Sequence, residues 1–193
     1  MSTNDHESTG WQLDQQAPEA YEQFLVPPMF APWAERLLDT LDVDDSDHVL
    51  DVACGTGIVA RQAASRVGDS GSVAGVDVNE GMLEMARTTA ARSALTIDFE
   101  QGEATALPFP DEAATVVCCQ QALQFVDDPV GALEEMRRVL EPGGRLGLSV
   151  WRPLEFQPGY AVLADALDRH VGSKLPHPTS LTAYAVRSLR VGL

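Results

Sequence analysis

Two acidic side chains and a pair of glycines are spaced in this sequence so that together they could bind a ligand. Asp51 lies inside a short apolar run, Gly55 and Gly57 follow it, and Asp77 comes at the end of a second apolar run. Glycines at such a turn let the backbone bend tightly and approach a ligand with no Cβ in the way. The carboxylate before the turn suits a ligand with a positive amine or sulfonium, and the later one suits ribose hydroxyls.

The elements that must position these residues can be read from the same stretch. Residues 49–52 are apolar, as in a buried strand, and residues 58–67 have the composition of a helix. A strand, a glycine turn and a helix place backbone N–H groups at the carboxyl end of a sheet strand. Ligands bind there in open α/β sheets.

Three interpretations of the glycine turn compete at this stage. Residues 55–60 satisfy the dinucleotide pattern G-x-G-x-x-A, and Asp77 follows at about the 20-residue spacing expected of it. The second interpretation is a site for a cationic ligand, which the carboxylate of Asp51 would attract. A dinucleotide would gain nothing from a carboxylate close to its pyrophosphate. The third interpretation is a turn that only joins a strand to a helix.

Further strands and helices alternate along the chain, as in a doubly wound α/β sheet. Strands are expected at residues 49–52, 72–78, 96–100, 114–119 and 145–151. Helices are expected at residues 33–41, 58–67, 80–87 and 129–140. Asp128 is the expected N-cap of the last helix, Pro129 its first residue, and residues 141–144 (Glu-Pro-Gly-Gly) its stop signal.

Four stretches in this order resemble the motifs of the class I S-adenosylmethionine (SAM) dependent methyltransferases, at residues 50–57, 75–83, 101–109 and 133–144. The similarity covers about residues 20–151, and the nearest branch includes the quinone-biosynthesis C-methyltransferases. It implies a Rossmann-like, mostly parallel sheet of order 3-2-1-4-5. The family has two more strands, 6 and 7, for which no sequence is visible here.

The resemblance also implies which residues hold SAM. Asp77 would bind ribose, Val78 and Met82 would flank adenine, and Glu103 would bind the adenine amino group, where the family more often has aspartate. Gln120 or Gln121 would bind the methionine part. The cofactor-binding residues expected are Asp51, Ala53, Gly55, Gly57, Asp77, Val78, Met82, Gly102, Glu103, Ala104, Gln120 and Tyr21.

The expected function is methyl transfer from SAM to a small-molecule or lipid-like acceptor by direct in-line displacement. No catalytic residue is assigned, and neither His170 nor His177 is assigned as a base. One alternative is a non-catalytic SAM-binding subunit or truncated remnant. The other is an NAD-dependent oxidoreductase, which explains neither Asp51 nor Glu103.

The net charge of the chain limits the kinds of partner that it can be expected to bind. The 193 residues carry 29 acids and 13 bases, for a net charge of −16, and Lys174 is the only lysine. Such a field disfavours nucleic acid and anionic membranes. This acidic composition fits either adaptation to high salt or an ordinary acidic protein.

The cysteines Cys54, Cys118 and Cys119 form no metal-binding pattern. No signal peptide or membrane-spanning run is visible, so a cytoplasmic protein is expected.

A single SAM-binding domain is expected over residues 1–193. Its parts are a mobile tail (1–19), a helical lid (20–45), a core (46–151) and a truncated partial cap (152–193). Without further strands, residues 145–151 would form an apolar sheet edge. We expect that edge to pair in a homodimer, to swap elements, or to be covered by the chain's own residues 157–193.

Overall fold

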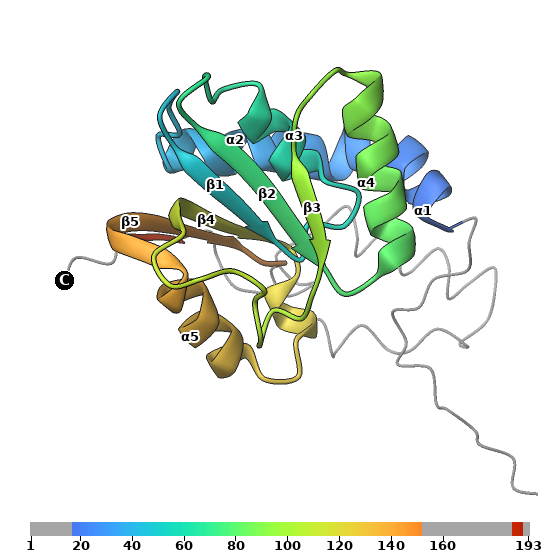
Figure 1. Ribbon diagram of the computed structural model, residues 1–193. Helices are drawn as coiled ribbons and strands as arrows, with labels where there is room; N and C mark the ends of the chain where they lie inside the picture. The colour runs from blue at the N-terminus through green and yellow to red at the C-terminus, as the bar shows by residue number, and fades with distance from the viewer. Residues whose placement is uncertain (1–16, 152–186, 191–193) are drawn as a thin grey trace, which may run out of the picture.

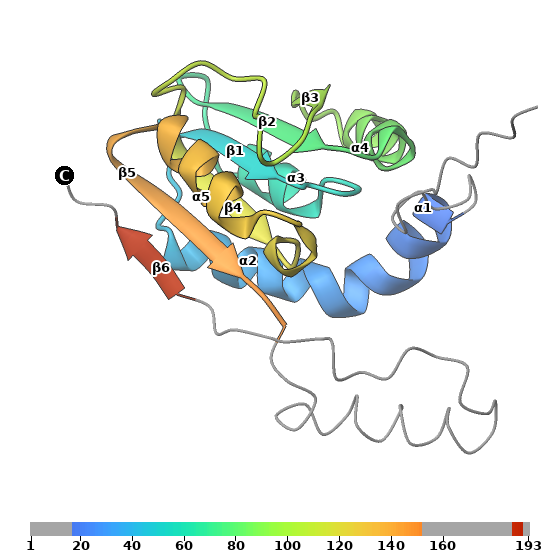
Figure 2. The same cartoon turned by 90° about the horizontal axis from the view of Figure 1, so that it is seen from below.

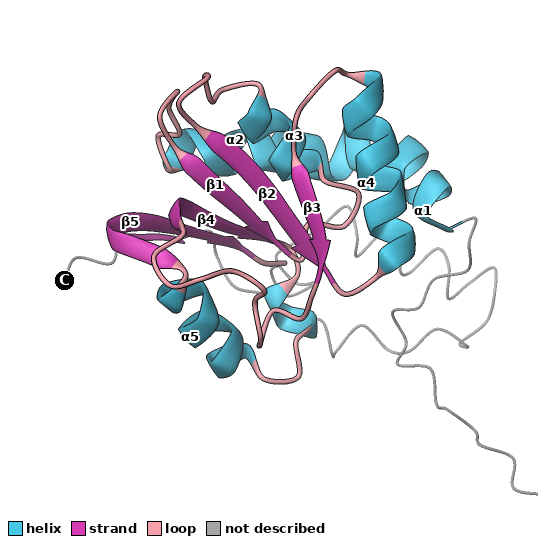
Figure 3. Cartoon of the chain, in the orientation of Figure 1, coloured by secondary structure: helices cyan, strands magenta, loops and turns pink. Residues whose placement is uncertain are grey.

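The computed structural model describes residues 17–151 and a short strand at residues 187–190 (Figure 1). The parallel strands run in the order β3-β2-β1-β4-β5, which confirms the predicted doubly wound α/β fold. Figure 3 shows this sheet between layers of helix. The five parallel strands are β1 (His48–Val52), β2 (Ser72–Asp77), β3 (Asp98–Gln101), β4 (Ala114–Gln120) and β5 (Leu140–Ser149). The expected mobile tail lies almost wholly outside the described residues, as do most of the partial cap and both His170 and His177.

The helices cover both faces of the sheet. The helices α2 (Ala31–Thr40), α3 (Ile58–Ala64) and α4 (Glu80–Arg92) lie on one side, and α5 (Pro129–Arg138) lies on the other (Figure 1). Successive residues of a strand point to opposite faces, so β4 supplies both cores. Its Val116 and Cys118 pack beneath α2 and α3, while Val117 and Cys119 pack beneath α5. The central strands are buried on both faces, as parallel strands usually are.

An N-terminal helical segment precedes the first strand. It consists of α1 (Ala17–Ala20), the π-helix η1 (Tyr21–Phe30) and α2, which follow one another along one side of the molecule (Figure 2). The predicted amphipathic helix near residues 33–41 is confirmed, and its apolar residues Leu37 and Leu38 are buried. The π-helical stretch was not predicted. It includes Pro27 and Pro28, and the Ala31 N–H that ends it bonds to Val26 O.

The helices α4 and α5, which lie on opposite faces of the sheet, each begin with a side-chain cap. Asn79 accepts a hydrogen bond from Met82 N at 3.2 Å at the start of α4. Asp128 accepts one from Gly131 N at 2.9 Å at the start of α5, and Pro129 is the first helical residue. The predicted cap and first residue of α5 are therefore confirmed.

The end of α5 and the start of β5 differ from the prediction. The helix ends at Arg138, not Leu140, because the carbonyl of Val139 is bonded by the backbone of the strand opposite, through the N–H groups of Ala113 and Ala114. Leu140 already pairs with Ala114, and the next pair is Val116 with Arg145. The residues predicted as a turn, 141–144, thus form an irregularity within β5.

The expectation that no strand follows the fifth is wrong. A short strand, β6 (Arg187–Arg190), pairs antiparallel with β5, with Leu146 opposite Leu189 (Figure 2). Of the three outcomes expected for this edge, the structure has the one in which the chain's own C-terminal segment pairs with it. The backbone groups of β5 that would otherwise be free find partners in this way.

Candidate functional site

A cavity of about 450 Å³ opens where β1, β2 and β4 end. That volume is within the range of small-molecule sites, about 300–1,000 Å³. It lies at the switch point of the strand order, where open α/β sheets bind ligands. Its lining is mostly apolar and aromatic, with a few polar groups: Tyr21, Phe30, Ala53, Asp77, Val78, Asn79, Met82, Gln120, Gln121, Ala122, Phe125, Val126 and Trp151.

Two lining residues have left-handed backbone conformations although neither is glycine. Ala53 has φ 55° directly after β1, and Gln121 has φ 56° directly after β4. Each such residue costs on the order of 1–3 kcal/mol and persists only where its surroundings enforce it. Gln121 N donates to Ser149 O at 2.6 Å, and Cys54 N donates to Val76 O at 3.0 Å. Neighbouring strand ends therefore hold both strained turns against the cavity.

The glycine turn depends on its lack of side chains. Gly57 has φ 80°, and a Cβ there would lie 2.9 Å from the ring of Phe99. Gly55 has φ 56° with no heavy atom within 4 Å of the Cβ position. The turn is therefore packed tightly on one side and open on the other, as a backbone surface facing a ligand must be.

Asp77 is the acidic group of the cavity wall. Its Oδ2 accepts from Gly55 N at 2.8 Å and its Oδ1 accepts from Asn79 N at 2.9 Å. Burial raises the pKa of this carboxyl, and the bonds from the two N–H groups oppose the shift. A carboxylate has about four acceptor sites, so Asp77 can still accept hydrogen bonds from a ligand.

Asp51 is buried and does not line the cavity. Its Oδ2 accepts from Ala60 N at 3.1 Å, which satisfies one of the unpaired N–H groups at the start of α3. The N-cap residue of that helix is Gly57, which has no side chain to supply a cap. Burial raises the pKa of Asp51 to about 8. A direct contact of Asp51 with a positively charged ligand stays a prediction.

Tyr21 brings the helical segment to the cavity. Its ring lies 5.1 Å from that of Phe30, whose ring in turn meets Trp151 edge-on at 6.1 Å. Burial, followed by the negative charge of Asp77, raises the pKa of the Tyr21 hydroxyl far above neutrality. Tyr21 is thus a hydrogen-bond donor at neutral pH and a poor general base. Among the described lining residues, only Tyr21 and Asp77 are acids or bases.

Gln120 joins β4 to the helical segment. Its Nε2 donates to Phe30 O at 2.9 Å, whereas its buried Oε1 has no hydrogen-bond partner. The Oε1 atom of its neighbour Gln121 is in the same situation. Unsatisfied buried acceptors cost free energy, so donors supplied by a ligand would be favoured here.

The structure brings together half of the predicted site residues. Six line the cavity: Tyr21, Ala53, Asp77, Val78, Met82 and Gln120. Six do not: Asp51, Gly55, Gly57, Gly102, Glu103 and Ala104. Glu103 is exposed, and a Cβ at Gly102 would lie 2.8 Å from Pro108 Cδ, so this glycine is explained by packing.

Sequence reasoning missed several lining residues. Phe30 belongs to the segment expected to act as a lid, so the sequence indicated that it lies near the site but not that it lines the cavity. Trp151 is the last residue of the last expected strand, and Phe125 follows β4, but nothing in their local patterns distinguishes them from core residues.

Other reactive groups give no alternative site. Burial raises the pKa of Cys54 well above that of a free thiol, so its unreactive protonated form predominates and its role is packing. Within residues 17–151, no cluster of histidine, cysteine or acidic side chains could hold a metal ion. No helix in the described part of the chain has the length and apolar character to cross a bilayer.

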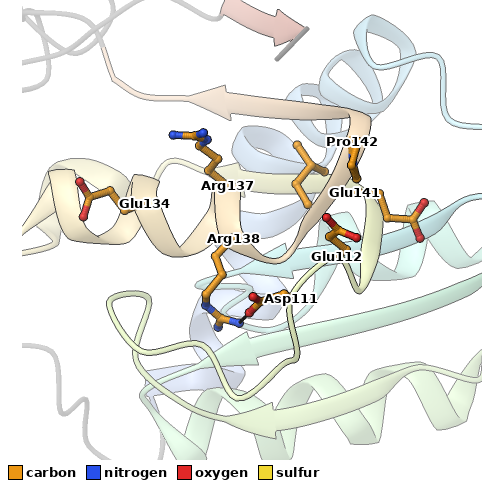
Figure 4. Close-up of a pocket in the computed structure, with 8 residues that line it drawn as sticks. Asp111, Glu112, Glu134, Arg137, Arg138, Glu141 and Pro142 are labelled. Atoms are coloured by element: carbon orange, nitrogen blue, oxygen red, sulfur yellow. Dashed lines mark hydrogen bonds and ion pairs between the residues drawn. The ribbon is translucent and has the colours of Figure 1, made fainter. Parts of the chain in front are cut away.

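A second cavity, of about 440 Å³, lies at the opposite end of the strands, between the end of α5 and the start of β5 (Figure 4). Two of its lining residues are arginines, Arg137 and Arg138, and Arg138 is paired with Asp111 at 2.8 Å and with Glu135 at 2.6 Å. None of the predicted site residues lies there. We therefore assign the candidate site to the first cavity.

The fold and the cavity define a Rossmann-like nucleotide-cofactor protein with its ligand site at the strand switch point. Comparison with known proteins identifies the family. Residues 50–148 match the family model described as a methyltransferase domain, and the chain belongs to that family. The predicted relationship to the class I SAM-dependent methyltransferases is confirmed, and SAM is the cofactor of this family.

Individual relatives agree with this. The chain is 37% identical over 161 residues to a ubiquinone/menaquinone biosynthesis C-methyltransferase of Hahella chejuensis, covering 82% of this chain and 63% of the relative. A SAM-dependent methyltransferase of Aquifex aeolicus shares the fold, with a TM-score of 0.67 at 21% identity over 90% of this chain and 82% of that one. The [4+2]-cyclase SpnF has a TM-score of 0.58 at 30% identity, over 62% and 44% of the two chains.

Proposed function

We propose that this chain transfers a methyl group from SAM to a small, largely apolar acceptor. The observation that carries the proposal is the position of Asp77, a partly buried carboxylate in a mostly apolar cavity at the switch point. The relative from Hahella chejuensis, named as a quinone-biosynthesis C-methyltransferase, supports a flat, apolar acceptor of lipid-like character. The chain spans 63% of that relative's length.

The lining fits this cofactor. Asp77 would accept hydrogen bonds from the ribose hydroxyls, and the open side of Gly55 would let the backbone approach the ligand. Val78 and Met82 would flank the adenine ring from the start of α4. The unpartnered Oε1 of Gln120 would accept a hydrogen bond from the amine of the methionine part.

The chemistry of SAM resides in its sulfonium, which makes the methyl group electrophilic. The protein then has to hold the acceptor in line with the methyl–sulfur bond and to keep water away. The rings of Tyr21, Phe30 and Trp151 make the apolar wall that would exclude water and stack on a flat acceptor. Among the lining residues that the structure describes, Tyr21 is a poor general base and Asp77 would be occupied by the ribose, which favours acceptors whose carbon or oxygen already carries negative charge.

Binding tests the proposal first. Calorimetry should show that the chain binds S-adenosylhomocysteine and SAM and does not bind NAD. Asp77→Ala should weaken binding by about 1–3 kcal/mol, since it removes a charged acceptor. Asp98→Ala, an exposed acid at the opposite end of β3, is the matched control and should leave the affinity unchanged.

Turnover tests it second. The chain is incubated with methyl-labelled SAM and a panel of quinone precursors, phenols and amines, and label in the product is measured. Label in phenolate or carbon-acid products is the expected result. Tight binding of SAM with no labelled product from any of them would favour a non-catalytic SAM-binding protein. NAD binding without SAM binding would refute the proposal.

A further inference from the structure

Arg61 is a buried cation in a helix that covers the sheet. It is only 8% exposed, and arginine is rarely buried unless it is paired. Its Nη1 donates to Thr56 O at 2.7 Å, and its Nη2 forms an ion pair with Glu22 Oε1, also at 2.7 Å. Both ends of the guanidinium fork are therefore committed to specific partners.

Those two partners belong to two different elements, each of which contains or adjoins a residue that lines the cavity. Thr56 is the residue between Gly55 and Gly57, so its carbonyl is part of the glycine turn. Glu22 adjoins Tyr21 in η1, and Tyr21 lines the cavity. One side chain thus joins the turn after β1 to the helical segment that carries Tyr21.

The other contacts between this segment and the sheet lie further along it. Gln62 Nε2 donates to Ala31 O at 3.0 Å, and Gln120 Nε2 donates to Phe30 O at 2.9 Å. Both secure the end of η1. Among the described residues, the polar side-chain contact at its start is the Arg61–Glu22 pair, so the position of Tyr21 depends on Arg61 most directly.

The pair is built for geometry more than for stability. Glu22 Oε2 is buried without a hydrogen-bond partner, and so is Thr56 Oγ1. Desolvation of a buried ion pair offsets much of its Coulomb attraction, and the offset is larger when an oxygen stays unsatisfied. What the pair supplies is a fixed arrangement, because a planar guanidinium holds two acceptors at set directions.

We propose that Arg61 is a positioning residue that couples the glycine turn to the helical segment over the cavity. Ligand affinity and closure of this segment then depend on a single guanidinium. The inference rests on the proposed function only in its choice of ligand, S-adenosylhomocysteine.

The test uses the full chain and four variants: Arg61→Gln, Glu22→Gln, the double variant, and Arg66→Gln. Arg66 also ties the region after α3 to α2, through Asp39 at 2.8 Å, but lies away from the turn and the cavity, so it is the matched control. Affinity for S-adenosylhomocysteine is measured by calorimetry, and amide hydrogen exchange is followed at residues 21–30 and 54–58.

Glu22→Gln should speed exchange at residues 21–30 alone and weaken affinity about threefold. Arg61→Gln should speed exchange in both segments and weaken affinity at least tenfold, and the double variant should be no weaker than Arg61→Gln. Arg66→Gln should keep affinity within twofold. If Arg61→Gln fails to fold, Arg61→Lys replaces it, since a lysine keeps the charge but cannot hold both acceptors.

In Arg61→Gln, exchange that rises in only one of the two segments, or equally across the whole sheet, would overturn the coupling. So would wild-type affinity in a folded Arg61 variant. A wild-type chain that binds no S-adenosylhomocysteine would instead refute the proposed function, and the exchange pattern would still decide the role of Arg61.

Discussion

At the scale of single residues, two similar carboxylates have different surroundings. Asp77 faces the cavity and keeps acceptor sites for a ligand, whereas Asp51 is enclosed and bonds to the start of α3. Burial raises the pKa of both. Asp51 thus satisfies an N–H group at the start of α3, and Asp77, which also accepts from Gly55 N in the turn, is the acid that a ligand can reach.

Asp51 should make stability fall with rising pH. Its folded pKa of about 8 is above the ordinary value of 3.8, so between these values the folded state keeps a proton that the unfolded chain has lost. The free energy of unfolding then decreases across that window, by up to about 1.4 kcal/mol per pH unit. The contribution of Asp51 is fully present below about pH 4 and is lost as the pH rises to about 8.

Asp51→Asn should remove this contribution while keeping an acceptor for Ala60 N. Urea unfolding is measured at pH 5, 6.5 and 8. The free energy of unfolding of the variant, relative to that of the wild type, should increase as the pH rises. Asp98→Asn, an exposed acid, is the control and should follow the wild type. Curves for the wild type and Asp51→Asn that stay parallel across the three pH values would contradict the assignment.

At the scale of elements, the ends of strands and the starts of helices create the site. The left-handed turns at Ala53 and Gln121 stop β1 and β4 side by side, and the cavity opens between them. The helices α4 and α5, which follow β2 and β4 in the chain, each begin with a side-chain cap. The N-terminal segment then closes one side through Tyr21 and Phe30.

Two neighbouring acids at the start of α5 allow the capping interaction to be tested separately from general charge. Asp128 accepts from Gly131 N, whereas Asp127 is exposed and outside the helix. Asp128→Ala should lower the free energy of unfolding by about 1 kcal/mol, the usual value of an N-cap, and Asp127→Ala should change it little. Chemical denaturation of the two variants compares them, and equal losses would mean that general charge, not the cap, is responsible.

At the scale of the whole molecule, the charge of −16 sets the behaviour in salt. Self-repulsion of 29 acids against 13 bases destabilises the compact state, and added salt screens it. If the composition is an adaptation to high salt, the melting temperature should rise markedly between low and molar potassium chloride. A melting temperature that stays flat or falls along this series would leave an acidic protein without that adaptation.

The sequence by itself determined the fold class, because an apolar strand, a glycine turn and a capped helix repeat along the chain, and hydrophobic period and turn chemistry depend on near neighbours. Asp128 and Pro129 could be placed for the same reason. The strand order and the family came from the resemblance of four stretches of the sequence to the motifs of the class I SAM-dependent methyltransferases. The end of α5 was misplaced because a contact made across the sheet, at Ala113 and Ala114, decided it.

Only the tertiary structure decided which predicted residues share a cavity. Asp51 and Asp77 look alike in sequence, yet the first is enclosed and the second faces the ligand space, because burial depends on distant segments that pack over them. The same holds for Arg61, a helix residue whose partners Glu22 and Thr56 become neighbours only after folding. Residue types indicate what a side chain can do, and packing determines what it meets.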